Sequence, residues 1–211
     1  MNRTLRSTLC ATALAALALA GCSNETGGEA TPSGPTTDAP GETSAATDTE
    51  TSGAEGDRAV EDLDIGGGAE DPCSLLTTDQ VTGYGFAEAG EVRESGVSTP
   101  ECKWSNREGT SLTDVYVHHD NTPGGLTGLI SREANFPFFE SGVEVVGRPA
   151  VHTDITAAPE GQCSTYVDLT ADSTLSIYVY ISEDDAAAYS DPCAKADEVA
   201  AQVIENIQGG I

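Results

Sequence analysis

Basic side chains are scarce in this sequence of 211 residues. It contains 9 lysines and arginines against 35 aspartates and glutamates, which gives a formal net charge of −26. Binding of nucleic acid needs a basic surface, and electrostatic docking on anionic lipid needs one as well. Only two lysines occur, Lys103 and Lys195, and the strong acidity would also favour solubility at high salt. The composition therefore excludes a nucleic-acid partner without identifying an activity.

Long apolar runs and catalytic motifs are missing too. Outside the N-terminus no run of about 18 apolar residues occurs, which excludes a protein with several membrane-spanning helices. The sequence has no Gly-x-Ser-x-Gly motif to present a nucleophilic serine and no Cys-x-x-Cys pair with zinc-binding spacing. We therefore expect no catalytic residue, no metal site and no cofactor.

Residues 1–21 have the pattern of a signal peptide. Two arginines precede an apolar region, 9–20, that is too short for a normal membrane span. The segment Leu19-Ala20-Gly21-Cys22 resembles a bacterial lipobox. That resemblance implies cleavage before Cys22 and attachment of diacylglycerol to its sulfur, which would anchor the protein on the outer face of the cell membrane. The alternative is an ordinary signal peptide with Cys22 near the cleavage site by chance.

Residues 22–70 have the composition of a tether. They are mostly Thr, Ser, Gly, Ala, Pro and acidic residues, with no aromatic residue, and the 12 acids against Arg58 give a net charge of −11. Such a segment cannot bury enough apolar surface to offset its ordering entropy. We expect a disordered spacer behind the lipidated cysteine. The alternative is an acidic tail that recruits basic partners.

Residues 71–211 have the composition of a folded domain and include every aromatic residue of the chain. Asp71-Pro72 and Asp191-Pro192 are typical of helix starts, and the second opens an amphipathic helix that ends at Gly209-Gly210. A short helix is expected at 126–130. Alternating polarity predicts five strands. One begins at residue 102, and the other four span 112–119, 142–151, 163–169 and 175–181. The order predicts an α+β domain: an antiparallel sheet of about five strands with helices on one face.

Four cysteines lie in this domain: Cys73, Cys102, Cys163 and Cys193. In an exported chain an even set predicts two disulfides, with three possible pairings. The similar spacings favour Cys73–Cys102 with Cys163–Cys193, since each pair then joins a helix start to a strand start. The alternative joins strand to strand and helix to helix, as Cys102–Cys163 and Cys73–Cys193.

Five features in order carry a resemblance to a known family. They are Asp71-Pro72-Cys73-Ser74-Leu75-Leu76-Thr77, Cys102-Lys103-Trp104, Gly147-Arg148-Pro149-Ala150, Cys163 and Asp191-Pro192-Cys193. Together they resemble the cysteine-containing cell-envelope lipoproteins of unknown function that are common in actinobacteria, with paired Asp-Pro-Cys motifs. The resemblance covers the whole chain and implies an envelope lipoprotein. It carries no catalytic residue over to this sequence.

Histidines and carboxylates are the remaining candidates for chemistry. His118 and His119 are neighbours in a predicted strand and so face opposite sides of it. His152 and Asp154 would complete a mixed site with them only if their strands lay side by side; surface and strand-end histidines are the simpler interpretation. Paired carboxylates are hard to exclude in so acidic a chain, so a carboxylate-dependent hydrolase acting on cell-wall polymer is the alternative function.

Four tyrosines form the candidate binding face. If the apolar residues of 163–169 and 175–181 point inward, then Tyr166, Tyr178 and Tyr180 share the opposite face, and Tyr116 occupies the same face of its own strand. Such a face could hold a glycan, a peptide or an envelope protein. Alternatively, the tyrosines only stabilise a half-exposed sheet or lie beneath a helix. We predict a monomeric, extracytoplasmic binding or sensing module, with the membrane as a partner through the lipid on Cys22.

Overall fold

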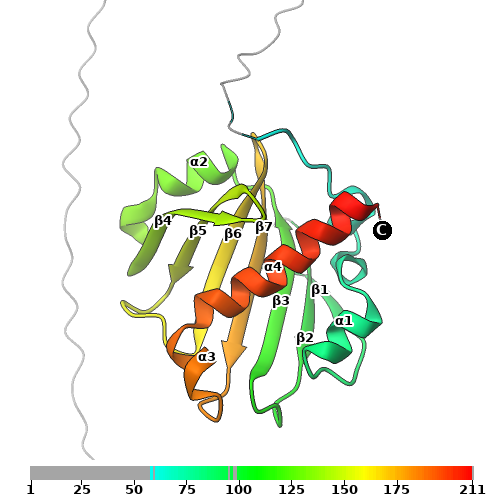
Figure 1. Cartoon of the computed structure of the whole chain (residues 1–211). Helices are drawn as coiled ribbons and strands as arrows, with labels where there is room; N and C mark the ends of the chain where they lie inside the picture. Colours follow the sequence, from blue (N-terminus) through cyan, green and yellow to red (C-terminus); the bar gives the residue numbers. More distant parts are fainter. Residues whose placement is uncertain (1–57, 59, 95, 97–98, 211) are drawn as a thin grey trace, which may run out of the picture. The chain divides into compact units, whose positions relative to one another are not determined.

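A single antiparallel sheet organises the domain (Figure 1). The computed structural model describes residues 58, 60–94, 96 and 99–210, so the predicted signal peptide, Cys22 and most of the predicted tether lie outside the described residues. The strands are β1 (Glu91–Glu94), β2 (Pro100–Ser105), β3 (Leu112–Asp120), β4 (Phe138–Val145), β5 (Arg148–Asp154), β6 (Gln162–Thr170) and β7 (Ser173–Ile181). Their order across the sheet is β1-β2-β3-β7-β6-β5-β4. The last strand in the sequence, β7, therefore lies in the middle of the sheet, between β3 and β6.

Short helices surround this sheet, and one long helix lies across it. They are η1 (Gly66–Ala69), η2 (Pro72–Leu75), α1 (Thr78–Gly83), α2 (Gly125–Ile130), η3 (Glu133–Asn135), α3 (Ala186–Ser190) and α4 (Pro192–Gly209). In the described part of the chain, no helix is long and apolar enough to cross a membrane.

The core lies between α4 and one face of the sheet. Figure 1 shows α4 running diagonally across the strands, and its contacts are mainly with β6 and β7. The helix buries an apolar stripe at helical spacing, made of Ala196, Val199, Ala200, Val203 and Ile204. The strands meet it with alternate side chains that are fully buried: Val167, Leu169, Leu175, Ile177 and Val179. Burial of these two complementary surfaces is the main stabilisation of the domain.

Two disulfides attach helical segments to this sheet. Cys73 of η2 is bonded to Cys102 of β2, and Cys163 of β6 is bonded to Cys193 in the first turn of α4. This is the pairing that the spacing favoured, with each bond joining a helix start to a strand. Structural disulfides form in oxidising compartments, so they indicate a protein that folds outside the cytoplasm.

The expectation of about five strands was too low. The stretch 142–151 is not one strand but parts of β4 and β5, which are joined at Val146 and Gly147 with φ of 49° and 73°. Positive φ at two adjacent residues is typical of a tight hairpin, but a β-branched valine rarely adopts it, so the sequence pattern hid the turn. The other missed strand, β1, is exposed throughout and forms by pairing with β2.

The expectation that all helices cover one face was also wrong. The short helix α2 packs against the face opposite α4, where Leu126 and Leu129 contact a small cluster containing Val151 and Tyr166. Tyr166 alternates along β6 with the core residue Val167, and so points to the other side of the sheet. Each face of the sheet therefore carries helical cover, and both α4 and α2 contact β6 and β7.

Part of the predicted tether is folded against the domain. The backbone N–H of Leu63 donates to the carbonyl of Leu169 at 3.0 Å, and the Arg148 guanidinium donates to the carbonyl of Glu61 at 2.9 Å. Ile65 is only 8% exposed and belongs to the core. Residues 61–65, which precede Asp71, therefore pack against the domain. Composition misses this because the contacts combine backbone groups with a few scattered side chains: Ile65, the half-buried Leu63 and Ala69, and Arg58, which pairs with Asp168.

Candidate functional site

The predicted tyrosines gather on the sheet face opposite α4. Tyr116 of β3 pairs across the sheet with Tyr178 of β7, and Tyr178 pairs in turn with Ser164 of β6. Tyr180, two residues after Tyr178, and Tyr166, two residues after Ser164, lie on the same face of the sheet. All four tyrosines are half-buried. The alternation of the sequence is thus realised as a cluster of rings on three neighbouring strands.

Three of these rings are in mutual contact. The ring centroids are 5.8 Å apart for Tyr116 and Tyr178, 4.8 Å for Tyr178 and Tyr180, and 6.3 Å for Tyr116 and Tyr180. Their planes are inclined by 37° to 66°, in the tilted and edge-on arrangements that aromatic quadrupoles favour. The cluster is therefore held in a fixed shape by the rings themselves and by the sheet beneath them.

A pocket of about 360 Å³ opens beside the cluster; we call it the tyrosine pocket. Its lining residues are Glu101, Tyr116, His118, Ser164, Tyr166, Ser176, Tyr178 and Tyr180. Ser164 and Ser176 have short side chains and are surrounded by the long side chains of the tyrosines. This difference in length makes the hollow. The volume falls within the range of roughly 300–1,000 Å³ that small-molecule sites occupy.

Three side chains that line the tyrosine pocket, Tyr178, Tyr166 and His118, have pKa values shifted so that their uncharged forms are favoured. Burial, reinforced by the adjacent hydroxyl of Tyr180, raises the pKa of Tyr178, whose hydroxyl donates to Oε1 of Gln162 at 3.0 Å. Burial likewise raises the pKa of Tyr166. Burial lowers the pKa of His118 and outweighs the nearby charge of Asp120. Phenol and neutral imidazole therefore offer hydrogen bonds here without charge.

The charged groups around the tyrosine pocket are paired. Nζ of Lys103 lies 2.8 Å from Oδ1 of Asp114 and 5.0 Å from the ring centroid of Tyr116. The hydrogen bond that Lys103 donates to Asp114 raises the pKa of Lys103, which keeps this cation charged over the ring. Oε1 of Glu101 lies 3.9 Å from Nη1 of Arg93. Each charge at the border thus has a partner of opposite sign.

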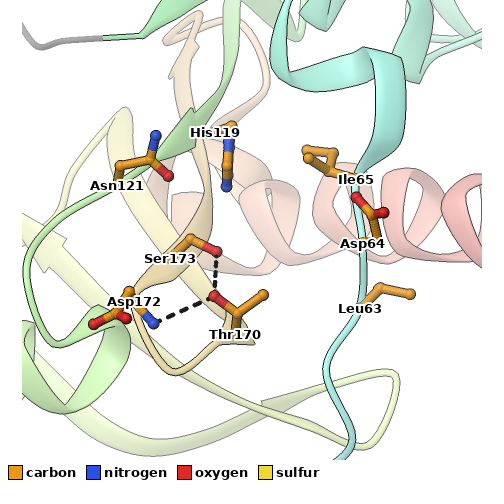
Figure 2. A pocket seen from close by; sticks show the side chains of 8 residues that line it. All are labelled: Leu63, Asp64, Ile65, His119, Asn121, Thr170, Asp172 and Ser173. Atoms are coloured by element: carbon orange, nitrogen blue, oxygen red, sulfur yellow. Dashed lines mark hydrogen bonds between the residues drawn. The ribbon is translucent and has the colours of Figure 1, made fainter.

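A second pocket, of about 230 Å³, lies where the folded end of the tether meets the β6–β7 turn (Figure 2). Several of its polar groups, on Asp64, Thr170 and Ser173, form hydrogen bonds that close turns. Thr170 Oγ1 lies 2.8 Å from Ser173 Oγ and accepts from the N–H of Asp172 at 3.2 Å, while Asp64 accepts from the N–H of Gly66 at 2.8 Å. Figure 2 shows Asp64 and Asp172 on opposite sides of this pocket. We interpret it as a packing defect at a docked segment.

His152 forms a cluster that sequence reasoning missed. Its Nδ1 lies 3.1 Å from Oε2 of Glu140, and its Nε2 lies 2.8 Å from Oδ1 of Asp197. Asp197 also accepts from the hydroxyl of Thr165 at 2.8 Å. The cluster joins β4, β5 and β6 to α4. Asp197 is 45 residues from His152 in the chain, so no local pattern could have predicted this contact.

The mixed histidine site considered from the sequence is not formed. His118 lines the tyrosine pocket, His119 lines the second pocket, and His152 is bound by Glu140 and Asp197 beneath α4. Within residues 58, 60–94, 96 and 99–210, no group of three or more histidines, cysteines and carboxylates is arranged to hold a metal ion.

The His152 cluster predicts a stability that falls with rising pH. Burial alone would lower the pKa of His152, but the hydrogen bonds and charges of Asp197 and Glu140 outweigh burial and raise it above 6.5. The protonated imidazole therefore stabilises the folded state fully below pH 6.5, and this contribution is lost as the pH rises through the folded-state pKa. Urea unfolding measured from about pH 6 to about pH 9 should show this decline.

The variant His152→Asn should lack that component of the pH dependence. His118→Asn serves as the matched control and should keep it, because burial lowers rather than raises the pKa of His118. A decline of equal size in both variants would show that another group is responsible.

The fold defines a class: a disulfide-bonded α+β domain of an extracytoplasmic protein, built on one antiparallel sheet. Residues 17–206 match the family of proteins of unknown function called DUF3558, and the chain belongs to that family. No curated protein sequence matches the chain, and no solved structure matches it either.

Proposed function

We propose that this protein is a lipid-anchored binding or sensing module of the actinobacterial cell envelope, and that its ligand site is the tyrosine pocket. The observation that carries the proposal is the gathering of Tyr116, Tyr166, Tyr178 and Tyr180 around one hollow on a rigid sheet. Tyrosine rings supply large contact area at low entropy cost and keep a polar tip for hydrogen bonds. Positioning them on strands rather than loops fixes the geometry before a ligand arrives.

The N-terminal sequence supports the envelope part of the proposal. The resemblance of Leu19-Ala20-Gly21-Cys22 to a lipobox, followed by an acidic spacer, is the arrangement expected of a domain held away from a membrane. The two disulfides agree with an extracytoplasmic location.

A hydrolase acting on cell-wall polymer is the alternative, and neither pocket favours it. Two carboxyl groups must flank the bond that is cleaved. The lining of the tyrosine pocket includes one carboxylate, Glu101, while the two carboxylates of the second pocket lie on opposite sides of it. The binding module is therefore the better account of the geometry.

Loss of ligand binding in Tyr178→Ala tests the site. The full mature chain, labelled with ¹⁵N, would be titrated with the soluble products of cell-wall digestion. We expect chemical-shift changes concentrated on β2, β3, β6 and β7, and at least tenfold weaker binding in Tyr178→Ala, since roughly 1.4 kcal/mol corresponds to tenfold.

Tyr84→Ala is the matched control for this test. Tyr84 is also half-buried, but it lies on the α4 side, where its hydroxyl contacts the carbonyl of Glu198. The control should bind like the unaltered protein. Shift changes that centre on α4, or equal losses in both variants, would contradict the proposed site.

Membrane anchoring has its own test in Cys22→Ser. If Cys22 carries the lipid, the variant should move from the membrane fraction to the medium and should not incorporate radiolabelled palmitate. Cys10→Ser is the control, because Cys10 lies within the predicted signal peptide. A Cys22→Ser protein that incorporates palmitate like the unaltered protein would disprove lipid attachment at this residue.

A further inference from the structure

We propose that the tyrosine pocket takes an uncharged saccharide, the exposed part of an envelope glycan. This inference rests on the proposed function, since it names the ligand class of the same site.

Anionic ligands are disfavoured by the charge of the domain. Residues 71–211 carry 23 acidic against 6 basic side chains, a net charge of −17. The cations beside two lining residues, Tyr116 and Glu101, are already paired: Lys103 with Asp114, and Arg93 with Glu101 itself. An anion would therefore meet a repulsive field without a free cation to bind it.

Cationic ligands are disfavoured because a cation of this chain, Lys103, already lies over a ring of the tyrosine pocket. The attraction of a tyrosine face for a cation is used by Lys103, whose ammonium lies 5.0 Å from the centroid of Tyr116. Glu101, the one carboxylate in the lining, faces Arg93. A ligand cation would have to displace Lys103, and Lys103 is additionally held by Asp114 at 2.8 Å.

The groups that remain are ring faces and neutral hydrogen-bonding atoms. The rings of Tyr178 and Tyr180 meet at 66° and border the hollow, while Ser164 contributes a hydroxyl and His118 an imidazole. A sugar ring presents C–H groups on its flat face and hydroxyls around its edge. Its faces would lie against the tyrosines and its hydroxyls would reach Ser164, the imidazole and the Glu101 carboxylate.

The size of the hollow agrees with a short saccharide. Its volume of about 360 Å³ lies near the lower end of the roughly 300–1,000 Å³ that small-molecule sites occupy. That is room for about one or two sugar rings. A longer glycan would extend from the pocket along the sheet face.

Fractionation of the cell-wall digest by charge tests the ligand class. The digest would be separated on anion and cation exchangers and each fraction added to the ¹⁵N-labelled full mature chain, with a neutral mannan, a galactan, a glucan and chitotriose as defined probes. We expect the neutral fraction to shift the resonances of Ser164, Ser176 and Tyr178, to remain active after proteinase treatment, and to bind about tenfold more weakly to Tyr178→Ala than to Tyr84→Ala.

The outcomes separate this inference from the proposed function. Activity in a charged fraction, or activity destroyed by proteinase, would overturn the saccharide and leave a binding site at the tyrosines. Displacement of Lys103 by tetramethylammonium, seen as a shift at Tyr116 without a response to any neutral fraction, would do the same. If no fraction moves a resonance of the tyrosine pocket, the proposed function itself fails.

Discussion

Replacing Cys163 and Cys193 together by serine should lower the free energy of unfolding by about 2–5 kcal/mol. The bond closes a loop between residues 30 apart and attaches the first turn of α4 to β6, where Cys163 is fully buried. Without it the unfolded chain gains conformational freedom, and the helix that covers the core loses its covalent attachment. Urea unfolding followed by the fluorescence of Trp104, which is 3% exposed, measures the change.

The single variant Cys163→Ser distinguishes the two disulfide pairings. With the pairing observed, the thiol released is that of Cys193, and alkylation followed by peptide mapping identifies it. The alternative pairing would release Cys102 instead. A double variant as stable as the unaltered protein would show that this bond contributes nothing to the folded state.

Replacing Arg148 by methionine should cost about 3 kcal/mol of stability, the second-largest effect that we expect. The Arg148 side chain is 7% exposed, and its guanidinium donates to the backbone carbonyls of Asp168, Leu169 and Glu61 at 2.7, 3.1 and 2.9 Å. Burial lowers the pKa of Arg148 despite the nearby charge of Asp168, so the cation depends on these acceptors. Methionine keeps much of the volume but leaves the carbonyls without their donor.

The same variant should release the folded end of the tether. Glu61 is held by Arg148, so hydrogen exchange at Leu63 should accelerate and limited proteolysis should reach the segment before η1. Arg93→Met is the control: this arginine is exposed and its ion pair is 3.9 Å long, so its loss should change stability by no more than about 0.5 kcal/mol. Unchanged exchange at Leu63 in Arg148→Met would contradict the assigned role.

The sequence predicts the part of the candidate site that depends on the alternation of side chains between the two faces of a strand. Successive strand residues point to opposite faces, so Tyr166, Tyr178 and Tyr180 had to share a face once their apolar neighbours faced the core. The hollow itself could not be predicted from the sequence. It depends on the register that brings Ser164 beside Tyr178 and Ser176 beside Tyr166, and register is a property of strand pairing.

The elements that were missed lack a local signal. The strand β1 is polar and exposed and exists because β2 offers a partner; a side chain at Gly90, just before it, would collide with the sulfur of Cys102. The β4–β5 hairpin turns at Val146, a residue type that predicts the opposite of a turn. In both cases the surrounding structure overrides the preference of the residues.

The sequence by itself determined the α+β class, the presence of two disulfides and the amphipathic helix at the C-terminus, because each follows from local patterns: alternation, an even set of cysteines and a helical apolar stripe. The cysteine spacing favoured one disulfide pairing, and the structure decided it. The tertiary structure decided the width of the sheet, the side on which α2 lies, the docking of the tether end on Arg148 and the position of His152 between Glu140 and Asp197. These features join residues that are distant in the chain, and their energies appear only when the strands and α4 come together.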